Sequence, residues 1–379
     1  MDVMKRIMLD KTYIVVITIS VILFHSCISN LNEKNPSYAY DLHIVDTINI
    51  NIANDIPEIA MSSKWSFNND YLSFVTVDES VVLYRFKFSN NSWRIFNLSH
   101  LSKYYINQLG GYVFINDSSI LLDHYPKGEI LLFGLKSGSI LQKIKIDNRF
   151  GIAHNDILKA YFDNKKLILP IMYMDIHDKA FNEKTKLAAI FNKKTNDIEY
   201  FGNYPSIGMT NEPRLNLMIP DITFDSVKMI VSFRNKDSIY SYNYSTETRE
   251  SKICKDNFVN SNTKLNYTGD EMKDVFREEF HGLYKSIIHD KHYYYRVSVS
   301  YPDFNGDLPH LQSALNEITD SRQVTVTVLN KKLDIVAQSI LPNINENNCF
   351  VRNEKIYLRS NQSSESRISF IGYKVQKKQ

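Results

Sequence analysis

Cysteine, glycine and tryptophan are scarce in this sequence, and the cysteine count already restricts what the protein can be. The 379 residues include 3 cysteines, 12 glycines and 2 tryptophans. After Cys27 only Cys254 and Cys349 remain, and no Cys-x-x-Cys spacing occurs, which argues against a structural zinc site. An oxidising compartment would permit these two cysteines to pair, but two unpaired, buried thiols agree with the sequence at least as well.

The sequence also lacks a large excess of positive or negative charge and any long apolar run. The formal net charge is +3, and it falls to +2 without residues 1–26. Nucleic-acid binding needs a concentrated basic face, so this balance argues against a nucleic-acid partner. The apolar run over residues 13–24 has twelve residues, short of the roughly 20 that span a bilayer.

The first residues nevertheless have the order of an export signal. A basic leader precedes the apolar run, and Ser26-Cys27 follows the run at once. This order predicts a signal peptide over residues 1–26 and lipidation of Cys27. Ser26 is the small residue that a lipobox requires, whereas Phe24 and His25 depart from the strict enterobacterial form and resemble looser Bacteroidetes lipoboxes. The alternative is an ordinary secretory signal with an incidental cysteine.

A lipidated Cys27 would anchor the protein to membrane lipid. We expect residues 27–38, which are mostly polar, to form the anchor and tether, with the folded domain over residues 39–379. The expected location is the outer membrane. Residues 28–34 lack the acidic cluster of known surface-export signals, so both the periplasmic and the surface side stay open.

The rest of the chain repeats one unit, an alternating strand followed by a short polar turn and a second strand. The 24 tyrosines and 21 phenylalanines favour strands. The turns lie at residues 89–92, 136–139, 192–197, 245–248 and 330–332. They recur at intervals of about 50 residues, with one interval of about 85, which is the scale of β-propeller blades. Asparagine is expected to supply positive φ angles in place of the scarce glycine.

We therefore predict an all-β fold, a six-bladed β-propeller. The strand over residues 40–50 has no hairpin partner nearby, and it is expected to close the ring by completing the last blade. Short helical insertions over residues 270–283 and 308–318 would fill the longest interval. A seventh blade in that interval and a pair of β-sandwiches are the alternatives.

The first strands of the units are assigned from their apolar residues. They are residues 72–77, 112–116, 166–172, 227–233 and 293–301, with 355–359 and 367–375 in the last unit. In this assignment residues 293–301 form an inner strand that borders the central channel.

Residues 287–296, Ile-Ile-His-Asp-Lys-His-Tyr-Tyr-Tyr-Arg, resemble a segment of a family of uncharacterised Bacteroidetes lipoproteins of similar length. The resemblance implies a lipid cysteine and a propeller-like body. It implies no activity and carries over no catalytic residue.

The same segment supplies the candidate ligand-binding residues, Arg296, Tyr294, His289 and Asp290. At a channel edge Arg296 could bind a carboxylate or phosphate with two hydrogen bonds. Alternatively, Arg296 pairs with an internal acid and braces neighbouring blades. Aromatic side chains such as Tyr294 could stack on sugars, although in strands they more often pack in the core.

Catalytic and metal-binding motifs are missing. There is no Gly-x-Ser-x-Gly, His-Glu-x-x-His or phosphate-binding glycine loop. Asp175, His177 and Asp178 could converge on a metal in a loop, although a polar loop tip is the more common meaning of such a cluster. The pairs Asp123-His124 and 154–156 are weaker still. We assign no catalytic residue, metal or cofactor.

These observations favour a non-enzymatic binding or scaffold lipoprotein whose propeller binds an envelope protein, peptide or glycan. The alternative is a propeller hydrolase or lyase acting on glycan or peptide, with Asp175, His177, His289 and Arg296 gathered in the channel. A sensor of small ligands is a third hypothesis that sequence does not separate from the first.

Overall fold

The structure is a computed structural model, and residues 40–379 form one compact unit separate from residues 1–39. It describes residues 38–52, 65–68, 70–77, 81–98, 109–124, 128–153, 159–163, 165–175, 178, 180–205, 218–256, 259, 280, 282–301, 321–364 and 366–378. The signal peptide, Cys27, the tether up to residue 37, His177 and residues 154–156 lie outside these ranges.

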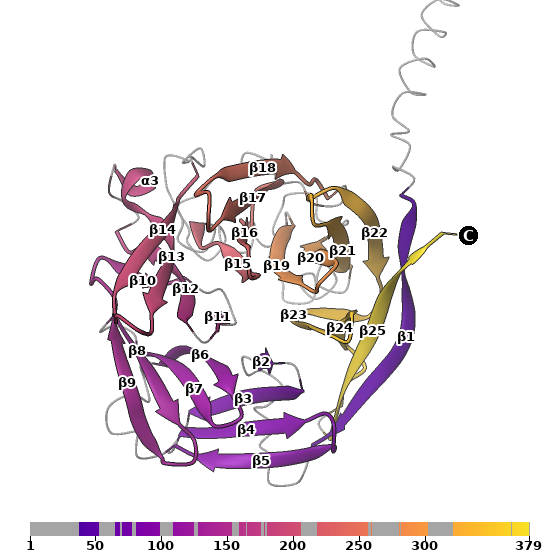
Figure 1. The fold of residues 1–379 in the computed structure, drawn as a ribbon. Helices are drawn as coiled ribbons and strands as arrows, with labels where there is room; N and C mark the ends of the chain where they lie inside the picture. The colour runs from indigo at the N-terminus through magenta and orange to yellow at the C-terminus, as the bar shows by residue number, and fades with distance from the viewer. Residues whose placement is uncertain are drawn as a thin grey trace, which may run out of the picture. The chain divides into compact units, whose positions relative to one another are not determined.

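Six antiparallel sheets form a ring, and in five of them the first strand in the chain lies innermost (Figure 1). Blade 1 comprises β2 (Trp65–Asn68), β3 (Tyr71–Val77), β4 (Val81–Lys87) and β5 (Ser92–Asn97), and blade 2 comprises β6 (Leu109–Asn116), β7 (Ser119–His124), β8 (Glu129–Gly134) and β9 (Ser139–Lys145). Blade 3 comprises β10 (Phe150–Ile152), β11 (Tyr161–Phe162), β12 (Lys166–Tyr173), β13 (Lys186–Asn192) and β14 (Ile198–Asn203). Blade 4 comprises β15 (Asp221–Phe224), β16 (Lys228–Ser232), β17 (Ser238–Asn243) and β18 (Arg249–Ile253). Blade 5 comprises β19 (Leu283–His289), β20 (Tyr293–Ser300), β21 (Gln323–Asn330) and β22 (Ile335–Leu341).

Blade 6 joins the two ends of the unit. It comprises β23 (Ile344–Arg352), β24 (Lys355–Ser360), β25 (Arg367–Lys377) and, outermost, β1 (Tyr40–Asn51). β1 pairs with β25 from Tyr40 opposite Lys377 to Asn51 opposite Arg367. The predicted six blades and the closure by the N-terminal strand are confirmed. The described strands form neither a seventh blade nor a pair of β-sandwiches.

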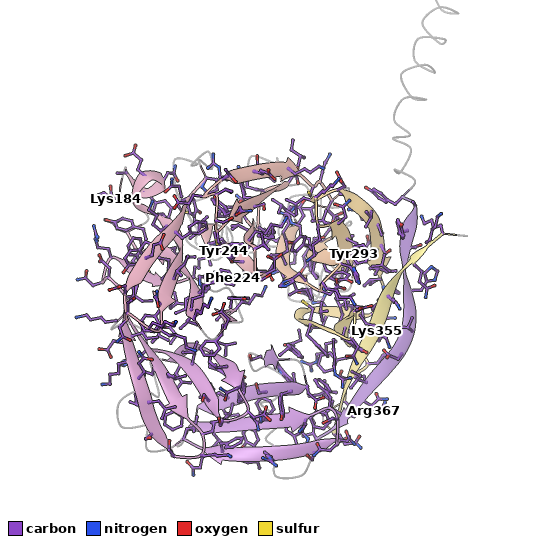
Figure 2. The ribbon with its side chains drawn as sticks, in the orientation of Figure 1. Lys184, Phe224, Tyr244, Tyr293, Lys355 and Arg367 are labelled. Atoms are coloured by element: carbon purple, nitrogen blue, oxygen red, sulfur yellow. The ribbon has the colours of Figure 1, made fainter. Side chains whose placement is uncertain are left out.

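The core is divided among the contacts between blades. Six clusters of buried apolar residues lie one at each junction of neighbouring blades. At the junction of blades 6 and 1, for example, Ile50, Trp65 and Phe370 pack together. Figure 2 shows this arrangement of side chains, with Phe224 beside the centre of the ring and Lys184 and Arg367 at its periphery. Each blade is thus stabilised by its two neighbours, which makes closure of the ring important.

The predicted assignment of first strands needs correction. Residues 72–77, 166–172, 227–233 and 293–301 fall in β3, β12, β16 and β20, which are the second strands of their blades. Two of the true innermost strands, β2 and β15, have only four residues and are too short to show the alternation by which strands are recognised. The prediction also omitted β19 and β23, which have seven and nine residues, whereas residues 112–116 do lie in the innermost strand β6. Residues 293–301 therefore do not border the channel, because β19 lies between them and the centre.

Asparagine supplies much of the left-handed backbone, as predicted. Positive φ angles occur at Asn91 and Asn196, in two of the predicted turns, and at Asn343 and Asn353. Asparagine tolerates this conformation better than most residues because its short side chain bonds the local backbone.

The helical prediction is only partly testable. Residues 270–279 and 308–318 lie outside the described ranges, and Leu283 begins β19 rather than ending a helix. The structure instead has a short helix, α3 (Phe181–Lys184), between β12 and β13. In the part of the chain that the structure describes, no helix has the length and hydropathy to cross a membrane.

Cys254 and Cys349 are both free and buried. Burial raises the pKa of each thiol to about 11, so both are inert thiols rather than reactive thiolates.

Candidate ligand-binding site

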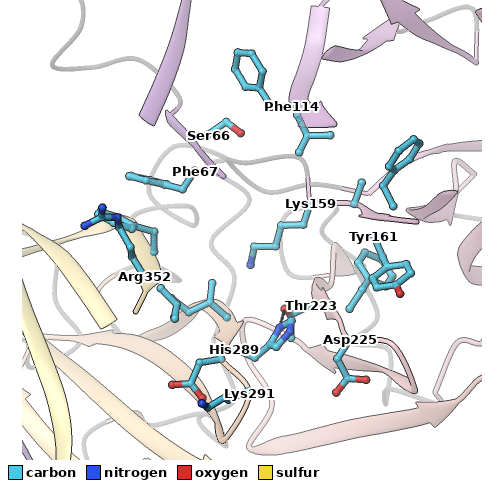
Figure 3. A pocket seen from close by; sticks show the side chains of 18 of the residues that line it. Ser66, Phe67, Phe114, Lys159, Tyr161, Thr223, Asp225, His289, Lys291 and Arg352 are labelled. Atoms are coloured by element: carbon cyan, nitrogen blue, oxygen red, sulfur yellow. Dashed lines mark hydrogen bonds between the residues drawn. The ribbon is translucent and has the colours of Figure 1, made fainter. Parts of the chain in front are cut away.

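A cavity of about 1230 Å³ lies at the centre of the ring (Figure 3). Every blade contributes to its lining, through Phe67, Phe114, Tyr161, Thr223, His289 and Cys349. Ligand pockets in proteins typically measure about 300–1,000 Å³, so this cavity has room for a ligand larger than a single metabolite.

The cavity occupies one half of the channel. Its lining comes from the C-terminal parts of the inner strands and from the turns that follow them, for example residues 225–227 and 290–291. Connections on this face of the ring are short turns, whereas longer ones such as 204–220 and 301–322 join strand ends at the opposite face. Short turns vary little in conformation, so the rim of the cavity is built from rigid elements.

The wall formed by blades 1, 2 and 6 carries a patch of aromatic side chains beside its charged groups. Phe67 of β2 stacks on Phe350 of β23, with ring centroids 4.1 Å apart and planes at 12°. Phe350 also stacks on Tyr357 at 5.0 Å. Phe114 of β6 continues the same wall. Stacked rings of this kind hold one another in place, so this wall is preorganised.

The opposite wall, formed by blades 4 and 5, is polar. Nδ1 of His289 lies 2.7 Å from Oγ1 of Thr223. Burial and the nearby Lys331 cation lower the pKa of His289 to about 4, so the imidazole is neutral at neutral pH. A neutral imidazole has one donor and one acceptor nitrogen, and Nε2 has no partner among the described residues.

A half-buried network of charges lies beside His289 in the lining. Nζ of Lys331 donates to the carbonyl oxygen of Asp290 at 2.7 Å and lies 4.0 Å from the ring centre of Tyr294. Tyr294 in turn donates to Oδ2 of Asp225 at 2.8 Å. Burial lowers the pKa of Lys331. Burial alone would raise the pKa of Asp225, but hydrogen bonds from Tyr294 and two backbone N–H groups outweigh it, and the pKa is lowered.

Lys159 connects three blades inside the channel. It precedes β11 in blade 3, and its Nζ lies 2.7 Å from Oδ2 of Asp221 in blade 4. The same ammonium donates to the carbonyl oxygen of Ile287 at 2.8 Å and to Oγ of Ser286 at 3.2 Å, both in blade 5. An ammonium has three donors, so Lys159 is fully occupied by the protein.

The four predicted ligand-binding residues are separated by the structure. His289 and Asp290 line the cavity, whereas Arg296 and Tyr294 do not. Asp290 has a clear structural task, because its Oδ1 accepts from the backbone N–H groups of His292 and Tyr293, both at 2.6 Å, and fixes the turn after β19. Of the four, only His289 offers a free polar atom to the cavity.

Arg296 is wholly buried between blades 4 and 5. Its guanidinium lies 3.2 Å from the ring centre of Tyr284. Its donors go to Oγ of Ser232 and to the carbonyl oxygens of Phe233, Lys236, Asp237 and Cys254. These contacts match the bracing alternative, with carbonyl oxygens in place of the expected acid.

The other polar clusters of the sequence lie away from the cavity. Asp178 accepts from the backbone N–H of Ala180 at 2.8 Å and from Nζ of Lys184, so it fixes the start of α3. His124 is buried beside Glu129, with Nδ1 and Oε2 3.3 Å apart. No group of three or more metal-ligating side chains occurs within the described ranges.

Several lining residues were not predicted, among them Lys159, Thr223 and Lys331. Lys331 was recognised only as part of a turn between strands. Thr223 lies within the four-residue β15 and Lys159 lies just before the two-residue β11, so their positions could be predicted only after these short inner strands were assigned.

The fold and the site together define a class, a six-bladed β-propeller with a ligand-sized central cavity. Among solved structures the chain resembles a member of the DUF4221 family from Bacteroides vulgatus, with 14% identity, a TM-score of 0.67 and coverage of 90% of this chain and 99% of that one. It also resembles a Bacteroides fragilis protein named as exported, with 9% identity, a TM-score of 0.51 and coverage of 91% and 98%. At these identities the similarity shows the fold alone. No protein-family model and no curated protein sequence matches the chain.

Proposed function

We propose that this protein is an exported, membrane-anchored binding protein of the cell envelope, with the lipid on Cys27 and the ligand in the central cavity. The cavity carries the proposal, because all six inner strands contribute to it and its walls are preorganised. An envelope location is supported by the predicted signal and by the exported Bacteroides fragilis neighbour.

The hydrolase or lyase alternative receives less support. It requires Asp175, His177, His289 and Arg296 to meet in one pocket. Of the three that the structure describes, only His289 lines the cavity, and Arg296 is occupied between two blades, while His177 lies outside the described residues.

Filling the cavity should abolish binding. Ala160 lines the cavity, and an Ala160→Trp side chain would occupy part of it. We expect at least one compound in a library of sugars, amino acids, short peptides and nucleosides to raise the unfolding temperature of the wild type and not of Ala160→Trp. Ala39→Trp, at an exposed alanine before β1, is the control and should respond like the wild type. Equal shifts in all three proteins, or none in any, would contradict a binding role for the cavity.

Loss of the lipid site should release the protein from the membrane. In a bacterial host that processes such signals, we expect Cys27→Ala to lower the membrane-bound share at least tenfold, because several acyl chains on one residue anchor firmly. Membrane fractionation measures the bound share of each protein, and the intact mass of the wild type shows whether it carries lipid. Cys254→Ala removes a buried thiol of the propeller and should stay in the membrane fraction. A Cys27→Ala protein that remains membrane-bound would show that the anchor lies elsewhere.

A further inference from the structure

The charged side chains that line the cavity are balanced in number, and five of the eight have a partner of opposite charge. Four are basic, Lys159, Lys291, Lys331 and Arg352, and four are acidic, Asp70, Asp225, Asp290 and Glu354. Arg352 lies 3.2 Å from Asp70, and Lys291 pairs with Glu354. Lys159 pairs with Asp221 behind the lining. A ligand with a net charge would upset this balance of four basic and four acidic groups, which disfavours it.

The cavity nevertheless offers unused hydrogen-bonding groups. Among the described residues, Nε2 of His289 has no partner and Nζ of Lys331 has one acceptor, the carbonyl oxygen of Asp290. The guanidinium of Arg352 has one carboxylate partner. The hydroxyl of Ser66, whose residue is only 2% exposed and lies between Phe67 and Phe114 in Figure 3, has no partner among the described residues. A matching ligand is therefore rich in groups that both donate and accept.

Aromatic rings supply the remaining surface. Phe67 and Phe114 lie on one side, and Tyr161 of β11 faces them from blade 3 (Figure 3). Neither tryptophan lines the cavity, so this surface consists of phenylalanine and tyrosine. Such rings favour ligands with flat patches of C–H groups.

We propose that the cavity binds a neutral oligosaccharide, with sugar-ring faces against Phe67, Phe114 and Tyr161 and hydroxyl groups on His289, Lys331 and Arg352. A sugar chain combines no net charge, hydroxyls that donate and accept, and C–H faces. These are the three properties that the lining requires. The volume of about 1230 Å³ suits several sugar units. This inference rests on the proposed function and names its ligand class.

The test is calorimetric titration of the full-length protein in a detergent without a sugar head group. The probes are neutral hexasaccharides of α-1,4-, β-1,4- and β-1,3-linked glucose and of β-1,4-linked mannose and xylose. Hexagalacturonate is the anionic comparator, and a serine-alanine hexapeptide with both ends blocked is the peptide comparator. We expect at least one neutral hexasaccharide to bind, and His289→Ala and Tyr161→Ala each to weaken it at least tenfold.

Tyr240→Ala is the matched control, because Tyr240 is a half-buried tyrosine outside the lining, and it should bind like the wild type. Unfolding temperatures verify that each variant folds, and His289→Gln replaces His289→Ala if that variant does not. Hexagalacturonate or the hexapeptide could instead bind more strongly, with the same dependence on His289. That result would rule out a neutral oligosaccharide as the ligand and would keep the binding role of the cavity. Failure of every neutral hexasaccharide would overturn the ligand class, while the Ala160→Trp experiment decides the binding role by itself.

Discussion

Replacing Arg296 with methionine is expected to lower the free energy of unfolding by about 3–5 kcal/mol, the range for removing a buried charged group from its partners. Arg296 is 0% exposed, and its N–H groups satisfy four backbone carbonyl oxygens and the hydroxyl of Ser232. Methionine fills similar volume but donates no hydrogen bond, so these acceptors would be buried without partners. Chemical denaturation measured by tyrosine and tryptophan fluorescence reports the loss.

Two further variants give this prediction its control and its detail. Arg94→Met, at an exposed arginine of β5, should change the free energy of unfolding by less than about 0.5 kcal/mol. Arg296→Lys keeps the charge but offers three donors without the planar fork of arginine, so we expect it to recover only part of the stability. If Arg296→Met folds as stably as the wild type and instead loses ligand, Arg296 is a binding residue and the bracing role is wrong.

Arg296 also shows which contacts the sequence could not predict. Its alternation with Tyr294 and Ser298 along the strand was visible, and so was the bracing alternative. Its acceptors, however, are mostly backbone carbonyls of residues 233–237 and 254, which carry no side-chain signature. Any sequence offers carbonyl oxygens at every position. Only the packing of blade 5 against blade 4 determines which ones surround the guanidinium.

The blade pattern was predictable because long alternating strands and asparagine-containing turns are local features. Asn91 and Asn196 mark two of the turns both in the sequence and by their positive φ angles. The innermost strands β2 and β15 were missed because they are short and carry polar residues, such as Ser66 in β2 and Thr223 in β15. Since those strands line the cavity, the candidate site was located only as far as His289 and Asp290.

The second large effect on stability concerns ring closure, which the sequence did predict. We expect Ile50→Ala to lower the free energy of unfolding by about 2–5 kcal/mol, the range for truncating a buried isoleucine. Ile50 is 0% exposed and packs with Trp65 and Phe370, where blade 6 meets blade 1. A cavity there weakens both the outer strand of blade 6 and the one junction that joins the two ends of the ring.

Ile44 provides the matched control, since it lies on the same strand and is 66% exposed. Ile44→Ala should change the free energy of unfolding by less than about 0.5 kcal/mol. Chemical denaturation compares the two variants, and hydrogen exchange of β25 reports whether β1 detaches. β1 also packs closely on β25 at Gly372, where an added Cβ would overlap Asp46 Oδ1 and lie 2.7 Å from Cε1 of Tyr357. If Ile50→Ala proves no more damaging than Ile44→Ala, the ring is held by the other five junctions and the N-terminal strand merely covers an edge. If Ile50→Ala is instead much less stable than Ile44→Ala, the closed propeller depends on β1. The central cavity, which all six blades line, then depends on β1 as well.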